Sequence, residues 1–123
     1  MAQALAPRAG ALEGPLSGWS GLGVVVAATC PEAARRIREI LPRSLFLVPG
    51  YGAQGASAAQ ALAGFVPAAG GPREGGVVSS SRALLFPPGS DTDAAGVWER
   101  AVDTALERAA AELGQALAGR SSL

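Results

Sequence analysis

The sequence contains no lysine and no histidine, and both absences restrict the chemistry that the chain can perform. Histidine changes its charge near neutral pH, and lysine supplies an ammonium group for proton transfer. A reaction that needs an imidazole base or an ammonium acid therefore cannot be carried out by this chain alone. Two explanations stay open at this point: arginine replaces lysine throughout the composition, or the catalytic groups lie elsewhere.

Cysteine, net charge and long apolar runs are scarce as well. The single cysteine, Cys30, excludes a disulfide within the chain and fits a reducing compartment. Ten basic residues balance ten acidic ones, without the clustered positive charge that nucleic acid or an anionic membrane selects. No apolar run approaches the roughly 20 residues of a membrane span, and residues 1–20 lack a signal-peptide pattern. We expect a cytoplasmic protein that binds neither nucleic acid nor membranes.

What the chain has is apolar residues, which make up 49% of its 123 positions, against 16% charged residues. This balance favours a compact α/β core of at most one domain. Three short apolar runs without alternation predict strands buried on both faces, at residues 23–28, 44–48 and 76–80. Helical patterns occupy residues 2–12, 31–41, 57–65, 83–86 and 96–117. Residues 13–23, 67–75 and 89–95 have the composition of loops.

The second helical pattern is amphipathic and has clear boundaries. Pro31 suits a first turn, and Pro42 ends the helix. We expect its apolar stripe to face the sheet: Ala33, Ile37, Ile40 and Leu41. The charged residues are expected mostly on the other face: Arg35, Arg36, Arg38 and Glu39. In the next helix, Ser57 is the expected N-cap residue.

The resulting order is β-α-β-α-β-α, which predicts parallel strands joined by right-handed crossovers. We expect a leading helix and loop at residues 1–22, three β-α units at 23–118 and a tail at 119–123. Three strands are few, because a parallel sheet needs both faces and its edges covered. The chain is thus more plausible as a piece of a larger barrel or sheet than as a complete domain.

A glycine-rich turn follows the second predicted strand, where residues 50–55 fit the G-x-G-x-x-G pattern of a dinucleotide site. That site also requires an acidic residue at the end of the next strand. The next strand ends in Ser-Ser-Ser-Arg at residues 79–82, and Glu74 precedes it instead. An arginine that holds a 2′-phosphate keeps the dinucleotide interpretation open.

A single-phosphate site is the second interpretation. Gln54 offers a side-chain amide, and Arg82 offers a guanidinium that can hold a phosphate with two donors. Because the two residues follow successive strands, they are expected to face one ligand, as in the phosphate sites of (β/α)₈ barrels. A structural alternative is a tight turn beside a solvated arginine, which we favour for Tyr51 or Ser79 taken alone.

Several segments resemble orotidine 5′-phosphate decarboxylase, in its longer bacterial subfamily. The resemblance rests on residues 23–29, 31–32, 37–42, 46–55 and 76–83. The subfamily carries a PGxGAQG turn and a later SSR segment, and this chain has PGYGAQG at 49–55 and SSSR at 79–82. The similarity covers about residues 18–117, and the paired motifs are its specific part.

The resemblance implies a TIM barrel, homodimeric in its full-length form, that converts orotidine monophosphate to UMP in pyrimidine synthesis without a cofactor. It also implies roles for particular residues. Gln54 would reach the phosphate and lie over the pyrimidine, and Arg82 would be the main cationic phosphate ligand. Backbone amides near Gly55 and at Ser81 and Arg82 would complete the cradle. Pro49 and Tyr51 would line the nucleotide pocket.

The chain departs from the family in its catalytic residues. The family uses an alternating Lys/Asp array on early strands and on the adjacent subunit, whereas this chain begins about where the sixth strand would begin. Asp91, Asp93 and Asp103 do not match that acidic motif, so no catalytic residue is expected in this chain. We expect a C-terminal portion that is inactive alone. Alternatives are another phosphosugar or nucleotide barrel enzyme, a free-standing phosphate-binding or assembly module, and a dinucleotide-binding module.

Overall fold

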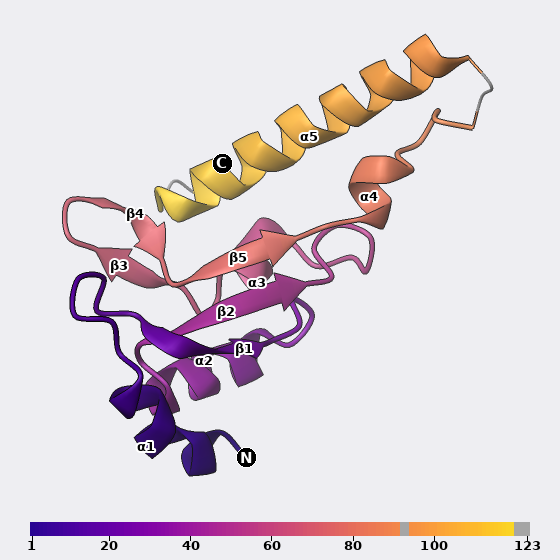
Figure 1. Ribbon diagram of the computed structural model, residues 1–123. Coiled ribbons are helices and arrows are strands. Elements are labelled where there is room, and N and C mark those ends of the chain that lie inside the picture. The colour runs from indigo at the N-terminus through magenta and orange to yellow at the C-terminus, as the bar shows by residue number, and fades with distance from the viewer. Residues whose placement is uncertain (92–93, 120–123) are drawn as a thin grey trace.

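The computed structural model describes residues 1–91 and 94–119 (Figure 1). Its elements, in chain order, are α1 (Ala2–Ala11), β1 (Ser20–Val25), α2 (Pro31–Ile40), β2 (Ser44–Pro49), α3 (Ala58–Ala61), β3 (Val66–Ala68), β4 (Gly71–Glu74), β5 (Gly76–Ser79), α4 (Arg82–Leu85) and α5 (Ala95–Leu117). Asp93 and residues 120–123 of the expected tail lie outside the described residues.

Three strands form an open parallel sheet in the order β1-β2-β5. Val25 is paired with Leu47, and Leu47 with Val77, so the three strands run side by side in one register. This confirms the predicted α/β fold with parallel strands, consistent with part of a TIM barrel. The described residues do not close a barrel. Because the strands are parallel, the loops that follow β2 and β5 leave the sheet at one end, where α4 begins (Figure 1).

The hydrophobic core lies on one face of the sheet. Phe46 and Val48 of β2 pack there against Ala34 of α2, Ala61 of α3 and the partly buried Leu113 of α5. Side chains on the other face are exposed: Val25, Leu45, Leu47 and Val77. The prediction of strands buried on both faces was therefore wrong for this chain, because its helices supply apolar cover to one face only.

The first strand begins earlier than predicted, at Ser20. The Ser20 amide donates to the carbonyl of Arg43 (2.7 Å), and its buried hydroxyl donates to the carbonyl of Ala9 (2.7 Å). Gly23 permits close pairing, since a Cβ there would stand 3.0 Å from the carbonyl oxygen of Leu45. Gly21 and Gly23, two of the glycines that suggested a loop, thus belong to a strand that approaches its neighbour closely.

The segment predicted as a loop at 67–75 is mainly a hairpin. β3 and β4 are antiparallel, with Val66 paired to Glu74 and Ala68 to Gly71. Gly70 has φ +74°, a left-handed conformation that suits a tight turn. Prolines made this segment look like a loop, but in a two-stranded ribbon every strand has a free edge that tolerates proline.

The helix after the glycine-rich turn is shorter than expected, but its cap is confirmed. The Gln60 amide donates to the Ser57 hydroxyl (3.2 Å), and the Ser57 amide donates to the Gln60 side chain (2.8 Å). This capping box starts α3. After the last residue of α3 the chain turns toward Gly64, where a Cβ would stand 2.6 Å from the Phe46 ring.

Arg38 was expected on the exposed face of α2, and that expectation was wrong. Its side chain is buried, and its guanidinium donates to five backbone carbonyls: Gly64 (2.7 Å), Leu41 (3.2 Å), Pro42 (3.1 Å), Ser44 (2.7 Å) and Gly75 (2.8 Å). It also lies 3.9 Å above the centre of the Phe46 ring. Burial lowers the pKa of Arg38 below its usual value.

The long terminal helix was predicted nearly to the residue. The C-terminal half of α5 packs on the core through Ala109, Leu113, Ala116 and Leu117. Its N-terminal half extends past α4 (Figure 1), where the Trp98 indole donates to the Leu85 carbonyl (2.8 Å). Across the described residues, no helix is both long and apolar enough to cross a bilayer.

Candidate functional site

A small pocket of about 160 Å³ lies beyond the carboxyl ends of β2 and β5. It is lined by residues from the two strand ends and the loops that follow them: Pro49, Gly50, Tyr51, Ala53, Gln54, Ser79, Ser80, Ser81 and Arg82. The structure therefore brings Gln54 and Arg82 to one pocket. This is the position where parallel β/α folds place their ligands.

The glycine-rich turn has the conformation that its sequence suggested. Gly50, Gly52 and Gly55 have φ values of +94°, +76° and +79°, all in the left-handed region that favours glycine. A Cβ on Gly50 would stand 2.7 Å from the side-chain oxygen of Gln54. The Gln54 side chain thus folds back over Gly50, and the turn needs glycine there for both conformation and space.

Hydrogen bonds within the turn already use several of its amides. The Gly52 amide donates to Ala56 (3.3 Å), the Ala53 amide to Tyr51 (3.0 Å) and the Gly55 amide to Gly52 (2.9 Å). Gly55 also lies outside the pocket lining. In this conformation the Gly55 amide donates within the turn, and the turn places Gln54 at the pocket.

The serine–arginine segment forms the opposite wall. The Ser80 hydroxyl donates to the Tyr51 carbonyl (2.9 Å), which ties the two loops together. Ser81 stands at the N-cap position of α4, and Arg82 is its first residue. Arg82 is exposed, and among the described residues no hydrogen bond or ion pair engages its guanidinium. Its paired N–H donors are free to bind an anion.

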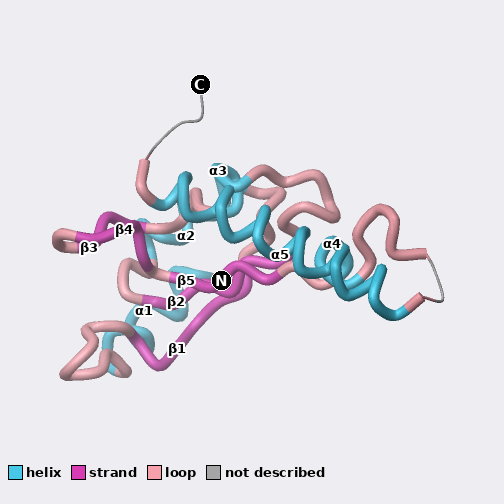
Figure 2. Tube along the Cα trace, turned by 90° about the horizontal axis from the view of Figure 1, so that it is seen from above, coloured by secondary structure: helices cyan, strands magenta, loops and turns pink. Residues whose placement is uncertain are grey.

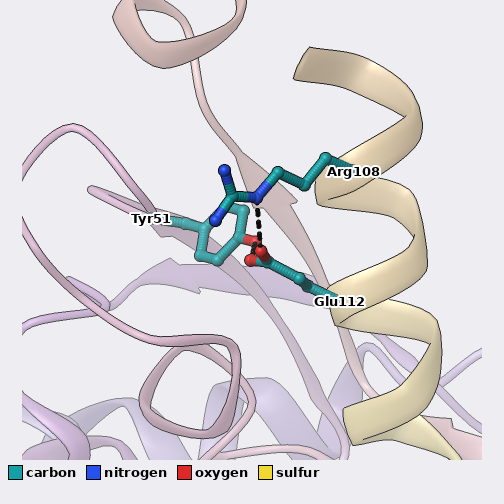
Figure 3. Close-up of polar contacts among 3 residues, drawn as sticks. All are labelled: Tyr51, Arg108 and Glu112. Atoms are coloured by element: carbon teal, nitrogen blue, oxygen red, sulfur yellow. Dashed lines mark hydrogen bonds and ion pairs between the residues drawn. The ribbon is translucent and has the colours of Figure 1, made fainter. Parts of the chain in front are cut away.

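Tyr51 lines the pocket, but the residue belongs to the hydrophobic core and is only 6% exposed. Its hydroxyl donates to Oε2 of Glu112 (2.6 Å), and Oε1 of Glu112 accepts from Nε of Arg108 (3.0 Å) (Figure 3). Burial and the neighbouring Glu112 raise the pKa of Tyr51 to about 12. The hydrogen bonds from Tyr51 and Arg108 lower the pKa of Glu112.

Sequence reasoning missed Glu112 and Arg108. They lie 61 and 57 residues after Tyr51, on a helix whose pattern indicated only an apolar face. Two acidic residues named from the sequence lie elsewhere. Asp91 and Asp103 are exposed and line neither this pocket nor the larger pocket described next.

A second, larger pocket of about 690 Å³ adjoins the first and shares Tyr51 and Ser80 with it. Its lining combines apolar residues, such as Leu84 and Val97, with Arg100 and Thr104 of α5. No sequence pattern indicated this pocket, because it depends on how α5 packs beside α4 (Figure 2).

Together these features define a class: a parallel β/α sheet with a glycine-rich turn and an unpaired arginine at neighbouring strand ends. Within that class, the chain is similar to the C-terminal part of orotidine 5′-phosphate decarboxylases, and the resemblance expected from the sequence is confirmed. No protein-family model matches the chain.

Three curated relatives illustrate the similarity. The decarboxylase of Caldicellulosiruptor bescii is 51% identical over 69 residues, which cover 56% of this chain and 21% of the relative. That of Halorubrum lacusprofundi is 41% identical over 80 residues, or 64% of this chain and 29% of the relative. That of Variovorax paradoxus is 40% identical over 100 residues, which cover 79% of this chain and 35% of the relative. The chain thus spans between a fifth and about a third of the length of these relatives.

Proposed function

We propose that this chain provides the phosphate-binding end of an orotidine 5′-phosphate decarboxylase, the enzyme that converts orotidine monophosphate to UMP. The observation that carries the proposal is the meeting of Gln54 and Arg82 in one pocket from successive strand ends. The name shared by relatives at 40–51% identity supports the same choice of ligand. A cytoplasmic location and a homodimeric full-length form belong to this proposal.

The pocket residues divide the work of holding a phosphate group. Arg82 supplies the cation and two parallel N–H donors, a geometry that matches phosphate oxygens. Gln54 would supply a neutral amide and Ser81 a hydroxyl, since both residues line the same pocket. Pro49 and Tyr51 would help to line the nucleotide pocket. Binding energy from this remote phosphate stabilises the transition state at the reacting ring.

We infer that the chain alone does not decarboxylate its ligand. The resemblance assigns protonation of the developing carbanion to a lysine, and this sequence contains none. The reacting ring would therefore have to meet a lysine that this chain does not supply. Measured turnover of orotidine monophosphate by the purified chain would contradict this inference.

Calorimetric titration of UMP into the purified chain tests the proposed site. Arg82→Ala should weaken binding by about 2–3 kcal/mol, the range for charge-assisted hydrogen bonds. Arg8→Ala is a matched control, because Arg8 is exposed on α1 and far along the chain from the pocket. Equal affinity of the wild type and Arg82→Ala would remove Arg82 from the site. Tighter binding of NADP than of UMP would favour the dinucleotide alternative.

A further inference from the structure

Tyr51 connects three separate parts of the molecule. Its carbonyl oxygen accepts from the Ser80 hydroxyl (2.9 Å) and from the Ala53 amide (3.0 Å), so both pocket-forming loops meet at one atom. Its hydroxyl donates to Glu112 (2.6 Å) on α5. The ring between these two ends is buried in the core. A shift of this residue would therefore move the base of the glycine-rich turn and the Ser80 wall together.

Glu112 accepts hydrogen bonds at both carboxylate oxygens, one from Tyr51 and one from its own helix. Arg108, one turn earlier on α5, donates to its other carboxylate oxygen (3.0 Å). On the same stretch of helix, Ala109 and Leu113 pack against the core, so the backbone that carries Glu112 is anchored. A hydrogen bond from a hydroxyl to a carboxylate is charge-assisted and stronger than one between neutral groups. Figure 3 shows the three side chains converging between the turn and α5.

We propose that Glu112 and Arg108 are positioning residues for the phosphate pocket, and that they act through Tyr51. The carboxylate fixes the tyrosine hydroxyl, the ring transmits that position to the Tyr51 backbone, and the backbone sets the distance between the Gln54 and Arg82 walls. Neither α5 residue is needed to touch the ligand. This proposal rests on the proposed function for the identity of the ligand. The coupling of Glu112 to the glycine-rich turn through Tyr51 can be tested without a ligand.

The ligand-free test is amide hydrogen exchange in the glycine-rich turn. The amides of Gly52, Ala53 and Gly55 each donate a hydrogen bond inside the turn, so their exchange reports how often the turn opens. In Glu112→Ala and in Tyr51→Phe these amides should exchange about five to ten times faster than in the wild type, as expected for loss of one hydrogen bond. Glu107→Ala, an exposed glutamate on the same helix, should leave them unchanged. Unchanged protection in Glu112→Ala and Tyr51→Phe would overturn the proposal, whether or not the chain binds a ligand.

The ligand test uses UMP and, separately, inorganic phosphate. Glu112→Ala and Tyr51→Phe should each weaken both ligands about three- to tenfold, and the double variant should be no weaker than either. Glu112→Gln should recover part of the loss, because the amide oxygen also accepts from the tyrosine hydroxyl. Wild-type affinity in both single variants, or losses that multiply in the double variant, would overturn the coupling through Tyr51.

The outcomes for the wild type separate this inference from the proposed function, and one further measurement tests the hydrogen bond itself. If the wild type binds neither ligand, or binds as Arg82→Ala does, the proposed function fails, and hydrogen exchange alone then decides the structural coupling. Tyr51 is the only tyrosine in the chain, so near-ultraviolet absorbance reports its ionisation without interference from another phenol. Its midpoint should fall in Glu112→Ala and stay the same in Glu107→Ala. An unchanged midpoint in Glu112→Ala would contradict the hydrogen bond on which the proposal rests.

Discussion

The two ends of the parallel sheet use arginine in opposite ways. At the amino ends of β2 and β5, Arg38 is 8% exposed and donates to five backbone carbonyls. At the carboxyl ends of the same strands, Arg82 is exposed and has no partner among the described residues. One guanidinium is consumed by the fold and the other is left for a ligand. The role of each arginine is therefore set by its end of the sheet and by the burial of its side chain, not by residue type.

The buried arginine should show the largest effect on stability. Arg38→Ala removes a donor from five carbonyls on three segments, residues 41–44, Gly64 and Gly75. Leu41 and Gly75 keep a backbone donor, but each buried acceptor left without one costs about 1–3 kcal/mol. We expect the free energy of unfolding to fall by about 4 kcal/mol or more, enough to unfold a small domain. Urea denaturation followed by circular dichroism measures this, with the exposed Arg36→Ala as control. A loss below about 1 kcal/mol would break the contrast between the two ends.

The sequence predicted the carboxyl end better than the amino end. Gln54 and Arg82 each follow a short apolar strand, and parallel strands bring such positions together by topology alone. The signals were local: three left-handed glycines and a serine–arginine pair. Burial of Arg38 depends on carbonyls of Gly64 and Gly75, which are 26 and 37 residues away. The helical period of α2 alone did not indicate that Arg38 is buried. Because arginine is charged, we expected it on the exposed face.

The same limit explains the other differences between sequence and structure. The hairpin at β3 and β4 contains the turn-forming residues of a loop, and only its tertiary pairing distinguishes it from one. The bond between Tyr51 and Glu112 joins residues 61 positions apart that share no pattern. The exposed sheet face, with Val77 64% exposed, follows from what this chain's helices cover. Strand patterns cannot report that cover.

High pH should weaken the carboxyl end through Tyr51. The pKa of Tyr51 is raised from 10.0 to about 12, so below pH 10 the tyrosine is protonated in both the folded and the unfolded chain and contributes no pH dependence. Between pH 10 and about 12 the unfolded chain loses its proton first, so stability falls. We expect a loss of about 1–2 kcal/mol, less than the full shift because Glu112 is exposed. Urea melts across this range measure it, and no lysine titrates there.

Tyr51→Phe is the control for that pH dependence. It should flatten the loss between pH 10 and 12 while the ring keeps its place in the core. An equally steep loss in Tyr51→Phe would show that another group causes the alkaline sensitivity. Tyr51 would then not make the carboxyl end of the sheet sensitive to pH.

Gly50→Ala should moderately reduce both the free energy of unfolding and the affinity for UMP. At φ +94° an alanine is strained, which costs about 1–2 kcal/mol. The new Cβ would also displace the Gln54 side chain, whose oxygen stands 2.7 Å from that position. We therefore expect weaker UMP binding together with the loss of stability, measured by calorimetry and urea melts. Gly10→Ala, in open space within helix α1, is the control: it should leave UMP affinity unchanged and raise stability rather than lower it, because alanine favours a helix. Unchanged UMP affinity in Gly50→Ala would separate the turn from the ligand.

The smallest expected change in stability belongs to Arg82, and it sharpens the comparison most. Because its guanidinium is exposed and has no partner in the described parts of the chain, Arg82→Ala should change the free energy of unfolding by no more than about 0.5 kcal/mol. The same substitution should remove most of the affinity for UMP. If Arg82→Ala instead destabilised the chain as strongly as Arg38→Ala, its guanidinium would have partners in the folded state. The carboxyl end would then be a second structural clamp, and the case for an anion site there would fail.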